Sequence, residues 1–148
     1  MTRCRGDSGQ LAGLEALPFG VLVFVVGALL VANVWGVVDA KLATTAAARE
    51  AARAYVEAPS AGDAAWAADA AAREAVAGHG RTPSRAGVDR IEGGFARCGR
   101  VTFEVSYPVP VVVLPWIGGL GEGFVARSRH SELVDPYRSG LPGEADCA

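Results

Sequence analysis

The chain has little of what most binding and catalytic sites need. Its 148 residues include two histidines and three cysteines, too few and too scattered for a zinc motif. It has no Walker-type phosphate loop, no glycine-rich dinucleotide fingerprint and no paired-cysteine motif. Fourteen basic residues against sixteen acidic ones leave no basic excess for nucleic acid. We therefore expect no cofactor, no metal, no nucleic-acid partner and no small-molecule substrate.

Charge is also missing from one long stretch near the N-terminus. Residues 16–38, ALPFGVLVFVVGALLVANVWGVV, contain no charged side chain and one strongly polar one, Asn33. A helix of this length spans about 35 Å, and a bilayer core is about 30 Å thick. The rest of a chain this small offers too little apolar surface to bury a helix that is hydrophobic all round. The pattern therefore predicts a transmembrane helix.

A cleaved signal peptide is the alternative to this anchor. Its apolar core is ordinarily about 7–15 residues long and is followed by a small-x-small site. The run here is longer, which favours the anchor, but residues 38–40 (VDA) have the composition of a cleavage site. Arg3 and Arg5 precede the run. The positive-inside tendency then predicts a single pass through the cytoplasmic membrane, with the N-terminus inside and the C-terminal domain outside.

Beyond the apolar run, the sequence first continues as helix and then changes to strand. Residues 39–58 contain no proline or glycine and predict that the first helix runs on, and a second helix follows over residues 60–77. Strict alternation predicts a strand over residues 101–107, with weaker strands over 88–96, where Gly93 and Gly94 indicate a bulge, and 124–134.

These elements predict an α+β fold with a long N-terminal helix, a second short helix and a small antiparallel sheet. Prolines exclude a central strand over residues 108–123. Along the chain we expect four parts. They are a cytoplasmic leader (residues 1–15), a transmembrane helix (16–38), an exported helical region (39–80) and a small β-rich extracytoplasmic domain with an irregular tail (81–148).

Two stretches carry a family resemblance. They are GQLAGLEALPFGVLVFVVGALLV at residues 9–31 and TAAAREAARAYVE at residues 45–57. This arrangement resembles the TadE-like family, the pseudopilin-like minor components of tight-adherence (Flp-type) pili, and HSELVDPYRSG at residues 130–140 looks like an actinobacterial branch. The resemblance implies a pilin-like, non-enzymatic membrane protein. Its implied partners are the membrane and other pilin-like subunits or the Tad-type secretion machinery.

The resemblance also singles out residues at the start of the apolar helix. In such proteins a peptidase usually cuts after a glycine that places a glutamate at the fifth mature position. Here a cut after Gly9 places Glu15 sixth, and a cut after Gly13 places it second. Neither cut places the glutamate where the family has it. The alternative is a family member whose leader is never cut. The Glu15 carboxylate either pairs with a neighbouring subunit's amino terminus during assembly or lies among headgroups at the positive end of the helix dipole.

Two of the three cysteines fall in the part expected outside. Cys98 and Cys147 lie there, whereas Cys4 lies in the leader. Disulfides persist in oxidising compartments, so one Cys98–Cys147 bridge is expected to hold the tail and contribute about 2–4 kcal/mol. The alternative is two independent thiols.

An apolar run without any period follows the second predicted strand. It is a candidate docking loop for another subunit or the membrane surface, because exposed apolar patches tend to mark contacts. Its alternative role is to complete the core. Its members are Val111, Val112, Val113, Leu114, Trp116 and Ile117.

One histidine lies in a setting that resembles a hydrolase site. His130 lies in SRHSE, between Ser128 and Ser131. Strand alternation places His130 and Ser131 on opposite faces, so they cannot act as a base and its nucleophile. The sequence therefore predicts a protein that is not an enzyme.

Overall fold

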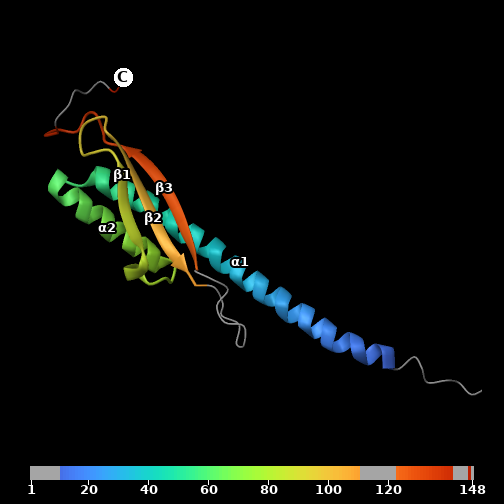
Figure 1. Ribbon diagram of the computed structural model, residues 1–148. Coiled ribbons are helices and arrows are strands. Elements are labelled where there is room, and N and C mark those ends of the chain that lie inside the picture. Colours follow the sequence, from blue (N-terminus) through green and yellow to red (C-terminus); the bar gives the residue numbers. More distant parts are fainter. Residues whose placement is uncertain (1–10, 111–122, 142–146, 148) are drawn as a thin grey trace, which may run out of the picture. The chain divides into compact units, whose positions relative to one another are not determined.

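The computed structural model describes residues 11–110, 123–141 and 147. It confirms the α+β fold class predicted from the sequence, with a long N-terminal helix, a shorter second helix and a three-stranded antiparallel sheet (Figure 1). The elements are α1 (Leu11–Glu57), α2 (Ala61–Gly78), the 3₁₀ turn η1 (Pro83–Arg85), β1 (Gly87–Glu92), β2 (Arg100–Val109) and β3 (Phe124–Leu133). The chain forms two compact units, Met1–Trp35 and Gly36–Ala148, which are described separately below.

Helix α1 is unbroken over its 47 residues. Alanine and leucine are its commonest helix formers, and proline follows shortly after its end. The one strongly polar side chain in the uncharged run is satisfied locally, because Asn33 Nδ2 donates to the Leu29 carbonyl at 2.8 Å. A polar group inside an apolar segment therefore costs little here.

Helix α2 begins directly after a capping residue, Ser60. The Ser60 hydroxyl accepts from the Asp63 backbone N–H at 3.3 Å and donates to Asp63 Oδ2 at 2.7 Å. This reciprocal pair satisfies one of the free N–H groups at the helix start. Gly80 has a φ of +69°, so the chain leaves the helix through a left-handed residue.

The sheet has the strand order β1-β2-β3, and the first strand is shorter than predicted. β1 ends at Glu92, and its irregular register lies between Arg90 and Glu92 instead of at Gly93 and Gly94. Gly93 has a φ of +81°, and a Cβ there would lie 1.8 Å from the Arg100 carbonyl oxygen. The glycine therefore turns the chain out of the strand instead of forming a bulge inside it.

The central strand is longer than predicted, because β2 continues through Pro108 to Val109. β1 pairs with β2 only as far as Ser106, so the end of β2 has β3 as its single neighbour. Proline lacks a backbone N–H and is tolerated where a strand has a free side. The expectation that prolines exclude a central strand from residue 108 was therefore wrong for its first two residues.

The core of the second unit is made largely of alanine. Helix α2 buries Ala64, Ala68, Ala72 and Val76, a stripe of every fourth residue. The stripe shares one apolar cluster with five buried residues of α1 and the four alternate residues of β2 from Val101 to Tyr107. The small side chains let the helices lie close to each other and to the sheet. The members from α1 and the inward face of β2 are Ala47, Ala48, Ala51, Ala52, Tyr55, Val101, Phe103, Val105 and Tyr107, with Ala58 beyond the helix end.

Candidate functional site

The first unit presents an exposed apolar helix. From Ala16 onward, α1 is long and apolar enough to cross a membrane, and none of its most apolar 18-residue window is buried. Phe24 and Trp35 are 75% and 72% exposed. The free energy of such exposed apolar surface is lower in contact with lipid than in contact with water. The segment could therefore serve as a single membrane anchor, although a signal sequence satisfies the same criteria of length and composition.

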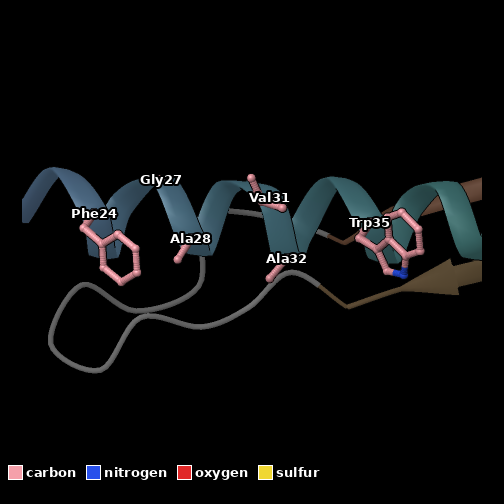
Figure 2. A pocket seen from close by; sticks show the side chains of 6 residues that line it. All are labelled: Phe24, Gly27, Ala28, Val31, Ala32 and Trp35. Atoms are coloured by element: carbon pink, nitrogen blue, oxygen red, sulfur yellow. The ribbon is translucent and has the colours of Figure 1, made fainter.

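One side of this helix carries an open hollow that is lined almost entirely by apolar atoms. Figure 2 shows Phe24, Ala28 and Ala32 on the same side of the helix, at successive intervals of four residues. The remaining lining residues are Gly27, Val31 and Trp35. Apart from the indole N–H of Trp35, this lining offers only van der Waals contact, which suits packing against lipid or another helix.

Several residues that the sequence analysis singled out lie where the structure gives no contacts. Glu15 and Gly13 belong to the first two turns of α1, of which the backbone alone is described, and Gly9 lies outside the described residues. Because α1 begins at Leu11, Glu15 is its fifth residue and not part of its first turn. The proposed docking loop, residues 111–117, also lies outside the described residues.

The structure brings together the two cysteines that the sequence analysis paired. Cys98, in the β1–β2 connection, and Cys147 are bonded, with their Cα atoms 5.2 Å apart and a separation of 49 positions in sequence. Cys98 also donates its backbone N–H to the Val134 carbonyl at 3.1 Å, and Val134 donates to the Gly99 carbonyl at 2.9 Å. The end of β3 and the C-terminal tail are thus fastened to the same loop.

We expect peptide mapping under non-reducing conditions to recover Cys98 and Cys147 in one linked pair. The bond closes a loop of roughly 50 residues, so Cys147→Ser should lower the free energy of unfolding by about 2–4 kcal/mol. Cys4→Ser is the matched control and should change neither the map nor the stability. Free thiols at both positions after rapid alkylation would contradict the pairing.

Arg138 also holds the C-terminal tail against the rest of the second unit, through contacts that the sequence did not predict. The Arg138 guanidinium donates to the backbone carbonyls of Val56, Glu57 and Ala58, and its Cζ lies 5.3 Å from the centre of the Phe95 ring. The last carbonyl groups of a helix have no hydrogen-bond donor within the helix, and the guanidinium supplies one. Its positive charge also interacts favourably with the negative end of the helix dipole. The tail therefore caps the end of α1, and no sequence spacing could join residues about 80 positions apart.

An ion pair lies at the opposite end of the second unit. Arg81 Nη2 is 2.6 Å from Asp39 Oδ2 and donates to the Gly36 carbonyl at 3.1 Å. The Arg81 side chain is only 15% exposed, and its Cζ lies 5.1 Å from the centre of the Tyr107 ring. The residues just after the uncharged run are thereby tied to the loop that follows α2.

Other polar contacts of the described residues lie on α1 and on β3. Hydrogen bonding to Glu50, with the charge of Glu50 and then of Glu57, raises the pKa of Arg53, a residue that is charged at every physiological pH already. His130 lies 3.0 Å from Glu132 on the inward face of β3, whereas Ser131 pairs with Thr102 on the outward face. Within the described residues, no three His, Cys, Asp or Glu side chains could hold a metal ion.

Comparisons with protein-family models, with curated proteins and with solved structures give no match for this chain.

Proposed function

We propose that the chain is a TadE-like minor pilin or pseudopilin, anchored in the cytoplasmic membrane, that takes part in assembling a tight-adherence (Flp-type) pilus without catalysing a reaction. The observation that carries this proposal is helix α1. From Ala16 to Val38 it is an exposed, uncharged segment, and further along it supplies buried alanines to the core of a small α+β unit. A helix shared between anchor and folded unit suits a subunit that is held by lipid first and by neighbouring subunits later.

The alternative is a domain released by cleavage near residues 38–40, which binds an envelope partner without polymerising. The contacts of this segment favour the anchor. Ala40 is fully buried, and Asp39 is the carboxylate paired with the nearly buried Arg81. Cleavage after Ala40 would leave the Arg81 charge without that partner, and an unpaired buried charge is costly.

The disulfide supports placing the second unit outside the cell. Structural disulfides persist in exported proteins and are rare in the cytosol. Cys98 and Cys147 are both in the second unit. An inside N-terminus and an exported C-terminal unit also agree with Arg3 and Arg5 in the leader.

Replacing Glu15 by Gln tests the role in assembly. The change keeps size and polarity but removes the charge, so insertion should survive because a neutral side chain is easier to place in lipid. If the carboxylate pairs with a neighbour's amine at low effective dielectric, its loss should lower incorporation into the surface fibre by about tenfold or more. The readout is the ratio of the protein in sheared surface fractions to that in membranes.

Glu74→Gln is the matched control, since Glu74 is an exposed carboxylate on α2, outside the apolar segment. It should leave the ratio unchanged. An equal ratio for wild type and the Glu15 variant, with both proteins present in the membrane, would contradict the assembly role of Glu15. Absence of the wild-type protein from surface fractions would contradict a place in the fibre.

A further inference from the structure

The second unit has an open hollow beside the end of the uncharged run. It lies between the first turns of α1 in this unit and the start of β3, and we call it the collar hollow. Its lining residues are Val37, Val38, Lys41, Leu42, Val125, Ala126 and Arg127. Lys41 Nζ donates to the Arg127 backbone carbonyl, which joins the two walls.

Among the residues that the structure describes, the lining of the collar hollow carries positive charge and no carboxylate. The positive charge comes from Lys41 and Arg127, which are both exposed. The nearest acidic residue on α1, Asp39, is already paired with Arg81. An ammonium has three N–H donors, so the bond to the carbonyl leaves donors on Lys41 for a second acceptor. The charge and the donors fit an anion.

The same surface is apolar on both sides of these cations. Val38 and Leu42 on α1 are 47% and 58% exposed, and Phe124 and Val125 on β3 are 63% and 46% exposed. A soluble anion would gain nothing from such neighbours. A phospholipid has a phosphate for the cations and acyl chains for the apolar residues, so the chemistry of the collar hollow matches both of its parts.

The position along the chain points to the same ligand. Val38 is the last residue of the uncharged run, and Lys41 is the first basic residue after it. If the run spans the bilayer, the headgroup layer lies at the level of these residues. We propose that the collar hollow binds the phosphate of an anionic phospholipid in the adjoining leaflet, through Lys41 and Arg127. This proposal rests on the membrane anchor proposed above.

The test uses the full chain in nanodiscs of equal parts phosphatidylglycerol and phosphatidylcholine. Native mass spectrometry after release from the disc counts the lipids that stay bound. Wild type should retain phosphatidylglycerol in preference to phosphatidylcholine. Juxtamembrane basic residues each contribute about 1 kcal/mol, so the double variant Lys41→Gln/Arg127→Gln should lose roughly fivefold in preference for each charge removed.

Two further variants separate charge from folding and from position. Lys41→Arg/Arg127→Lys keeps both charges and should keep the preference. Arg49→Gln/Arg100→Gln removes two exposed charges that lie outside the collar hollow and should also keep it. Equal retention of both lipids by wild type, or equal loss in the Arg49/Arg100 control, would overturn the lipid site alone. A chain that does not enter nanodiscs would overturn the anchor, and the lipid site with it.

Discussion

Ala68→Leu is expected to lower the melting temperature of the second unit by roughly 4–12 °C. Ala68 is fully buried in the stripe of α2 that meets the alanines of α1 and the inward side chains of β2. The added carbon atoms have no space, and overpacking a core costs about 1–3 kcal/mol. At roughly 4 °C per kcal/mol for a unit of this size, the loss is readily measured. Thermal unfolding of the full chain in detergent, followed by near-ultraviolet circular dichroism, gives the value.

Ala70→Leu is the matched control for this variant. Ala70 lies in the same helix but is exposed, and leucine is nearly as good a helix former as alanine. Its melting temperature should therefore stay within about 2 °C of wild type, because surface substitutions away from special features usually change stability by less than about 0.5 kcal/mol. Equal melting temperatures for both variants would contradict close alanine packing of α2.

The helices and the central strand could be predicted because their determinants are local. A capping serine, a proline and a glycine define the ends of α2, and alternating residues define β2. The end of β1 and the passage of β2 through Pro108 could not be predicted in this way. They depend on where the neighbouring strand stops, and strand pairing is not a local property.

Of the contacts that hold the second unit together, one could be predicted from the sequence and others could not. The pairing of Cys98 with Cys147 could be inferred, because two cysteines in one compartment leave a single intramolecular partner each. Arg81 with Asp39 and Arg138 with the end of α1 lie 42 and about 80 positions apart, and arginine has many exposed alternatives in this chain. The collar hollow was missed for the same reason, because α1 and β3 form it jointly.

The double variant Val26→Asp/Leu30→Asp is expected to remove the protein from the membrane. Both side chains are exposed in the uncharged run, 47% and 62%, so the change should leave the second unit folded. The run has fourteen Leu, Phe and Val residues, which together favour insertion by about 4–8 kcal/mol. Each aspartate near the helix centre costs about 2.5–3.5 kcal/mol, so two of them cancel most of that gain.

Trp66→Asp/Tyr137→Asp is the matched control, because it replaces two large side chains that are 76% and 85% exposed on the second unit. If only the uncharged run anchors the chain, this control should stay in carbonate-washed membranes as wild type does. Release of both double variants would show that the exposed side chains of the second unit also hold the protein at the membrane.

The central claim is that residues 16–38 stay in the mature chain and anchor it in the membrane. The most direct test is to measure, for the wild-type protein, the intact mass of the membrane-bound chain and the identity of its N-terminal peptide. We expect a disulfide-bonded chain in the washed membrane fraction whose mass includes all of residues 16–38, whether or not the leader before them has been cut. A chain that begins near Ala40 and is recovered in the soluble fraction would contradict the anchored, pilin-like account.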